Sequence, residues 1–245
     1  MSRHLTYRSG NPVLNKSTFL SSHVQSEKMT INGTVNKTLI SLILLITAGY
    51  YCFTSVSPVI IFGGAIGGLI VAIITIFKKE WAPITVPIYA LLEGCFLGGI
   101  SYMYNTMYEG IVSNAIFLTI GILLSLLFAY KSGWIKPTEN FKLGIAAATG
   151  GIFIVYLINM IMGFFGNQMG IMDINNSSMF SIGFSLFVVV IASLNLVLDF
   201  DFIEEGAEKG APKYMEWYGA FGLLVTLIWL YLEILRLLAK LNSRR

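Results

Sequence analysis

Three acidic residues lie in stretches of this sequence that are otherwise apolar, and they are the residues best placed to do chemistry. Glu93 lies near the middle of one apolar run, Asp199 near the end of another, and Glu233 within the last. A charged carboxylate at the centre of a membrane helix costs about 2.5–3.5 kcal/mol. Residues of this kind are therefore expected to bind a proton, an ion or a partner charge.

The composition indicates that most of the chain lies in a membrane. Of 245 residues 56% are hydrophobic and only 12% are charged, whereas soluble domains carry about 25% charged residues. A helix rises about 1.5 Å per residue, so a run of about 20 apolar residues crosses a hydrocarbon core of roughly 30 Å. Seven runs meet this requirement: 37–54, 58–77, 82–104, 110–130, 141–165, 178–202 and 214–239.

These runs predict an all-α membrane protein, a bundle of seven transmembrane helices joined by short loops. Strands of membrane barrels alternate in polarity over about ten residues, which these continuous runs do not do. Residues 1–35 are polar and lack a secretory signal, so we expect a mobile cytosolic tail. Residues 36–242 are then a single membrane domain.

The basic residues are distributed unevenly between the two sides of the predicted bundle. Twelve Lys and Arg residues fall in the tail and in the second, fourth and sixth links, and none falls in the other links. Because cytoplasmic loops are rich in Lys and Arg, the N-terminus is predicted to be cytoplasmic. The C-terminus also carries basic residues, so the seventh segment either crosses against this rule or dips into the membrane and returns. The residues concerned are Arg236, Lys240, Arg244 and Arg245.

Other polar residues could support the acidic cluster. Asn195 lies one turn before Asp199 on the same helix face, so we expect it to support that carboxylate. Asp201 points in another direction, towards the cytosolic headgroups. Glu216 lies at a depth similar to that of Asp199 and is an alternative partner for it.

Each acid also has a purely structural interpretation. Glu233 could pair along its own helix with Arg236 or Lys240. Asp199 could simply cap the cytosolic end of its helix, and Glu93 could be protonated and make one structural hydrogen bond. Asp199 and Glu233 would also lie at different depths if the last helix were straight. They meet only if residues 213–221 lie along the membrane interface.

A cluster of Glu93, Asp199 and Glu233 would have a definite chemistry. Carboxylates that lie close together in a medium of low dielectric constant titrate as a coupled unit. When they are ionised, their oxygens suit calcium, a hard cation. Protons and calcium would then compete for one site, which would make it a pH switch on an ion path.

Three segments resemble a known family. They are LEGCFLGGIS at 92–101, LNLVLDFDFIEEG at 194–206 and LYLEILRLLAKL at 230–241. In this order, within seven short-linked spans, they resemble the Bax inhibitor-1 family, the transmembrane Bax-inhibitor-motif proteins, in a bacterial branch. The resemblance covers most of residues 36–242.

The resemblance implies a pH-sensitive calcium leak in a bacterial cytoplasmic membrane. Its sensor would be the acidic pair of the last two helices, Asp199 and Glu233, which would also be the calcium ligands, with Glu93 as the acid of the third span. Calcium would be the permeant or bound ion, and no other cofactor is expected. The alternative is a non-transporting membrane regulator that binds a membrane protease or another membrane protein, through the tail or the acidic 204–208 loop.

An enzyme is not expected. Both histidines, His4 and His23, lie in the tail, so a histidine–zinc site in the membrane lacks its ligands. The sequence has no Gly-x-Ser-x-Gly motif for a nucleophilic serine. Phosphate-binding loops and basic nucleic-acid patches are also missing from the sequence, so no nucleic-acid partner is expected. The expected partners are the lipid bilayer and, if the protein is a regulator, a membrane protease or another membrane protein.

Overall fold

The computed structural model describes residues 28–244, and within that range it contains seven long helices and no β-strand. All seven are long and apolar enough to cross a membrane, which confirms the predicted seven-span bundle. The helices are α2 (Ile31–Thr54), α3 (Pro58–Phe77), α4 (Ala82–Met107), α5 (Ile111–Lys131), α6 (Glu139–Phe164), α7 (Met179–Glu208) and α8 (Met215–Asn242), with short 3-10 turns η1 (Lys79–Trp81) and η2 (Gly170–Met172).

The first membrane helix starts earlier than its apolar pattern predicts. The predicted run begins at residue 37, but α2 begins at Ile31, where the Thr30 side chain accepts a hydrogen bond of 3.0 Å from the Gly33 amide. A threonine at this position satisfies a free N–H group of the first turn. The predicted tail, residues 1–35, otherwise falls mainly outside the described part of the chain.

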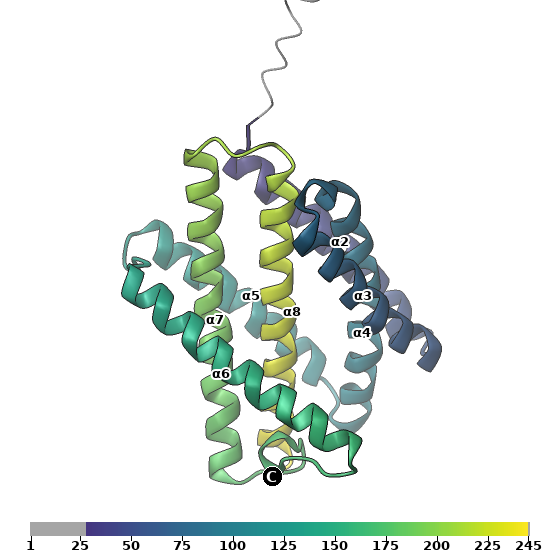
Figure 1. Ribbon diagram of the computed structural model, residues 1–245. Helices are drawn as coiled ribbons and strands as arrows, with labels where there is room; N and C mark the ends of the chain where they lie inside the picture. The colour runs from purple at the N-terminus through teal and green to yellow at the C-terminus, as the bar shows by residue number, and fades with distance from the viewer. Residues whose placement is uncertain (1–27, 245) are drawn as a thin grey trace, which may run out of the picture.

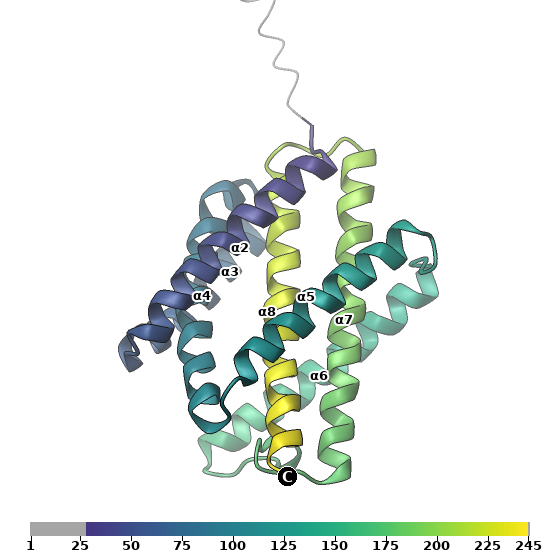
Figure 2. The same cartoon turned by 180° about the vertical axis from the view of Figure 1, so that it is seen from behind.

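Helix α8 is the centre of the bundle. Figures 1 and 2 show α7 and α8 standing side by side, with α2, α3 and α4 on the other flank of α8 and with α5 and α6 crossing on opposite faces. Leu224, Leu230 and Leu235 of α8 have no exposed surface. A helix that is buried nearly all round is expected to be apolar all round, so the polar side chains that α8 does bury need partners.

Glycines allow α2 and α4 to pack closely. A Cβ atom at Gly94 would lie 2.4 Å from the Leu45 carbonyl oxygen, and one at Gly98 would lie 2.2 Å from the Gly49 carbonyl oxygen. Both positions therefore exclude any side chain, as expected for small residues between membrane helices. Gly63 of α3 differs, because a Cβ there would have no neighbour within 4 Å.

The C-terminus lies at the opposite end of the bundle from the start of α2 (Figures 1 and 2). Helix α8 is continuous over 28 residues, so of the two alternatives for the last segment, a full crossing fits and a segment that dips and returns does not. Two of the four basic residues near its end have partners inside the protein. Arg236 pairs with Glu233, and Lys240 has no exposed surface. These two side chains point into the protein, so they are not the free surface charges that the charge rule counts.

Candidate functional site

Glu93 and Asp199 line the same cavity, which has a volume of about 720 Å³ and lies between α3, α4, α7 and α8. Each helix contributes a different part of the wall, so the site exists only in the folded bundle. Apart from the two acids, the lining is Ala65, Leu69, Ala72 and Ile76 of α3, Tyr89 and Phe96 of α4, Phe202 of α7, and Tyr218, Phe221, Gly222, Val225 and Thr226 of α8.

The Glu93 side chain fits against α3 because residue 68 is a glycine. A Cβ atom at Gly68 would lie 2.5 Å from the Glu93 Oε1 atom, closer than any real contact allows. Gly68 therefore provides the space that the carboxylate occupies. This is a specific role for one of the glycines on α3, in addition to helix packing.

Asp199 faces α8 across the cavity wall. A Cβ atom at Gly222 would lie 3.6 Å from Asp199 Oδ1, and Thr226 lies beside the carboxylate one turn further along α8. The other oxygen, Oδ2, is buried and has no hydrogen-bond donor among the described residues. A buried acceptor without a donor is unfavourable, so this oxygen would be stabilised by a donor.

Within residues 28–244, Glu93 and Asp199 are the helix acids that are not exposed and have no cation beside them; Glu204 and Glu208 of α7 are exposed. Five other helix acids in that range are paired: Glu216 with Lys37 at 2.8 Å and Lys213 at 3.4 Å, Glu233 with Arg236 at 3.0 Å, Asp201 with Lys142 at 2.6 Å, Glu139 with Lys142 at 3.5 Å, and Glu205 with Lys209. The absence of such a partner singles out Glu93 and Asp199 as the pair that could receive a cation from outside the chain.

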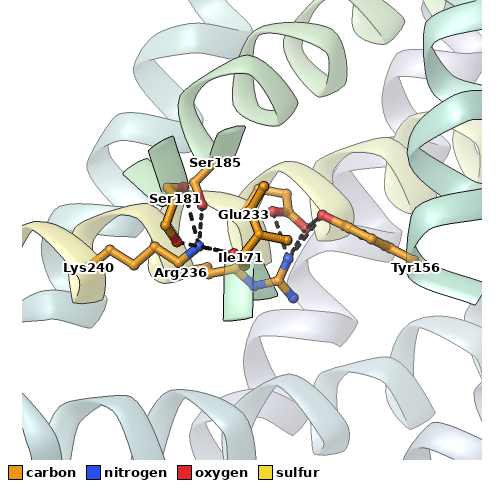
Figure 3. Close-up of polar contacts among 7 residues, drawn as sticks. All are labelled: Tyr156, Ile171, Ser181, Ser185, Glu233, Arg236 and Lys240. Atoms are coloured by element: carbon orange, nitrogen blue, oxygen red, sulfur yellow. Dashed lines mark hydrogen bonds and ion pairs between the residues drawn. The ribbon is translucent and has the colours of Figure 1, made fainter. Parts of the chain in front are cut away.

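Glu233 does not join this pair, so the predicted convergence of three acids is wrong. Its carboxylate accepts a hydrogen bond of 2.6 Å from the Tyr156 hydroxyl of α6, and Arg236 donates to both of its oxygens at 3.0 Å (Figure 3). The reason is geometric. Because α8 is straight, Glu233 lies seven residues beyond Thr226, roughly 10 Å further along the helix axis. The predicted calcium pair of Asp199 and Glu233 therefore does not form.

The residues expected to support Asp199 have other partners. Asn195 donates to the Thr149 hydroxyl at 2.8 Å and to the Ile191 carbonyl at 2.9 Å, and so it holds α7 to α6. Its position one turn from Asp199 does not bring the two groups together, and this expectation is wrong. Asp201 lies outside the cavity lining and pairs with Lys142 at 2.6 Å, and its predicted position at the cytosolic headgroups stays a prediction.

Glu216 is also not a partner of Asp199. It is fully buried at the start of α8, where it accepts hydrogen bonds from the Thr30 amide at 3.0 Å and the Thr30 hydroxyl at 2.9 Å. Lys37 of α2 completes the contact. Glu216 therefore fastens the beginning of α2 to the beginning of α8, which explains why a lysine is tolerated inside a membrane helix.

A second polar centre lies near the end of α8, and only its ion pair between Glu233 and Arg236 was among the alternatives drawn from the sequence. The Lys240 ammonium donates to the Ile171 carbonyl at 2.6 Å and the Ser185 hydroxyl at 2.9 Å (Figure 3). Arg236 also donates to the Tyr156 hydroxyl at 2.9 Å. These two cations join α8 to α6, to α7 and to the link between them. We refer to Tyr156, Glu233, Arg236 and Lys240 as the C-terminal clamp.

The cavity offers a cation only a partial set of ligands. Within residues 28–244 no group of three or more His, Cys, Asp or Glu side chains could hold a metal. Calcium takes six to eight oxygen ligands, whereas the cavity lining provides two carboxylates and three residues with hydroxyl groups, Tyr89, Tyr218 and Thr226. A calcium ion here would keep part of its water shell and would bind weakly.

Comparison with protein-family models supports the sequence resemblance. The model described as Bax inhibitor 1 like matches residues 11–243, nearly the whole chain. The chain belongs to the Bax inhibitor-1 family. Comparison with curated proteins and with solved structures found no match. In this member of the Bax inhibitor-1 family, the acids of the third and sixth spans share a cavity, and the acid of the last span is neutralised separately.

Proposed function

We propose that this member of the Bax inhibitor-1 family is a pH-sensitive calcium leak in which Glu93 and Asp199 bind the permeating ion. The observation that carries the proposal is that these two carboxylates share one cavity without a cation from the chain. A carboxylate in a membrane helix is costly unless it is neutralised. A cation that enters the cavity neutralises both.

The incomplete ligand set favours a leak over a storage site. Conduction needs binding that is strong enough for an ion to enter and weak enough for it to leave. Two carboxylates with a few hydroxyls and water meet this condition, whereas a full shell of protein oxygens holds calcium firmly.

The proposed pH response follows from competition. Calcium binds to ionised carboxylates and displaces their protons, so a higher pH favours calcium binding. A lower pH fills the same oxygens with protons and removes the charge that attracts the ion. We therefore propose that calcium flux decreases as the pH on the cavity side falls.

The orientation is part of the proposal. Exposed lysines lie in the links between α3 and α4, between α5 and α6 and between α7 and α8, at the end of the bundle where α2 begins. They are Lys78, Lys79, Lys131, Lys136 and Lys209. By the positive-inside rule this end faces the cytoplasm. The C-terminal clamp then lies towards the outer face of what we propose is a bacterial cytoplasmic membrane.

The experiment is calcium flux into liposomes that contain the purified protein and a calcium-sensitive dye. Glu93→Gln and Asp199→Asn keep the side-chain size and are each expected to lower flux by about tenfold, the effect of losing one charged ligand. Asp201→Asn is the matched control, because this acid lies two residues from Asp199 but pairs with Lys142 outside the cavity. Its flux should equal that of the unaltered protein.

Unchanged flux in both cavity variants would remove Glu93 and Asp199 from the mechanism. An unaltered protein that passes no calcium at any pH would reject the leak. That result would favour the alternative function, a non-transporting regulator that binds a membrane protease or another membrane protein.

A further inference from the structure

The cavity is larger than an ion requires. Its volume is about 720 Å³. A calcium ion with six or seven waters occupies roughly 200 Å³, because each water takes about 30 Å³ in the liquid. Pockets for organic ligands have volumes of about 300–1,000 Å³. The space around Glu93 and Asp199 therefore fits an organic molecule as well as an ion.

The lining has the chemistry of an organic-ligand site. Aliphatic and aromatic side chains from all four helices surround only two charged groups, Glu93 and Asp199. The rings of Tyr89 and Phe221 meet edge to face, with centroids 5.1 Å apart, and form one wall. A mostly apolar wall with a few convergent polar groups is typical of small-molecule sites.

The cavity is open at the surface of the bundle rather than enclosed. Four of its lining side chains keep a large exposed fraction: Leu69 60%, Ile76 49%, Phe202 43% and Val225 39%. These residues lie within membrane spans. A ligand would therefore enter sideways from the bilayer, in which apolar molecules concentrate.

We infer that this cavity binds a lipophilic amine, with the ammonium group between Glu93 and Asp199 and the apolar body against α3 and α8. An ammonium group supplies three N–H donors, and the buried Oδ2 atom of Asp199 lacks a donor among the described residues. Tyr89 and Phe221 add aromatic faces that attract a cation. An anion would be repelled by both carboxylates, and a neutral molecule would leave Oδ2 with a weaker partner.

This inference rests on the proposed function in one respect, because both need the two carboxylates to be ionised and accessible. It does not need the cavity to conduct. The two can therefore fail separately, and a bound amine would also be expected to reduce calcium flux by occupying the ion's position.

The test uses 4-phenylbutylamine as the probe and 4-phenyl-1-butanol, a neutral molecule of similar shape, as its control. Binding to the full chain in nanodiscs of zwitterionic lipid is measured by saturation-transfer NMR and calorimetry, with empty nanodiscs as background. The amine is expected to bind at least about tenfold more tightly than the alcohol, because a charge-assisted hydrogen bond is worth more than a neutral one. Equal binding of amine and alcohol would overturn the inference.

Two variants locate the site. The double variant E93Q/D199N should bind the amine at least about tenfold more weakly, with Asp201→Asn as the variant that keeps binding. Ala72→Phe fills the cavity from α3 and should abolish binding while both carboxylates remain. Thermal unfolding without ligand checks that each variant is folded. If the double variant does not fold, the binding measured with Ala72→Phe decides the test. Undiminished amine binding in a folded variant of either kind would overturn the inference.

The flux assay separates this inference from the proposed function. Amine binding without calcium flux would leave the ligand site standing and reject the leak. Calcium flux that depends on Glu93 and Asp199 without amine binding would reject the ligand site alone.

Discussion

The Arg236 guanidinium lies 3.0 Å from both carboxylate oxygens of Glu233, one turn earlier on α8. Tyr156 of α6 donates to the same carboxylate. The acids inside the bundle are therefore of two kinds. Glu233 is neutralised within the C-terminal clamp and Glu216 by Lys37, whereas Glu93 and Asp199 share a cavity without a cation from the described chain. Only the acids of the second kind are free to respond to an ion.

The ion pair of the C-terminal clamp should contribute to stability rather than to flux. Glu233→Gln leaves the partly buried Arg236 without its counter-charge and is expected to lower the free energy of unfolding by about 2–3 kcal/mol. Removing both partners, in Glu233→Gln with Arg236→Met, should cost less than the sum of the two single changes. Thermal unfolding of the four proteins in detergent measures this cycle. Additive effects, or a loss of calcium flux in a folded Glu233→Gln, would contradict the assignment.

Lys240 should hold the link between α6 and α7. Lys240→Met removes the donor that three acceptors share, the Ile171 and Ser181 carbonyls and the Ser185 hydroxyl. We expect faster amide hydrogen exchange in residues 165–178, because this link loses its attachment to α8. Lys209→Met is the control, since that lysine is exposed and lies at the other end of α7. Unchanged exchange in the link would show that Lys240 does not hold it.

Gly33 should be required for the buried position of Glu216. A Cβ atom at Gly33 would lie 2.0 Å from Glu216 Oε1, so Gly33→Ala must displace the carboxylate from Thr30 and Lys37. The expected loss is about 1–3 kcal/mol of unfolding free energy, the usual range for a broken buried network. Gly63→Ala is the matched control, because it has space and should gain helix propensity. Equal unfolding temperatures for the two variants would be evidence against this role.

The spans were predictable from sequence because each is a continuous apolar run, and the runs 58–77 and 178–202 agree closely with α3 and the membrane part of α7. The start of α2 was not predictable in the same way. Lys37 breaks the apolar pattern, and its acceptance inside a helix depends on Glu216, which is distant in sequence. Patterns detect local periodicity, whereas partners of this kind arise only from packing.

The site was predictable only in part for the same reason. Glu93 and Asp199 were recognised as functional candidates because they are acidic residues inside apolar runs. The i, i+3 spacing of Glu233 and Arg236 indicated the ion pair that the structure contains. The clamp contacts of Lys240 were hidden, because two of its three acceptors are backbone carbonyls and carry no signature in the sequence. The Asn195 prediction failed because Asn195 donates to Thr149 of α6 and to the Ile191 carbonyl instead.

The central claim is that protons and calcium compete for the Glu93 and Asp199 oxygens. The most direct test is calcium flux in liposomes as the pH is stepped from about 8 to about 5, a range that includes the values at which buried carboxylates titrate, for the unaltered protein and for E93Q/D199N. The account predicts that flux through the unaltered protein falls as the pH falls and that the double variant shows low flux independent of pH. A folded double variant that keeps the pH profile of the unaltered protein would contradict it.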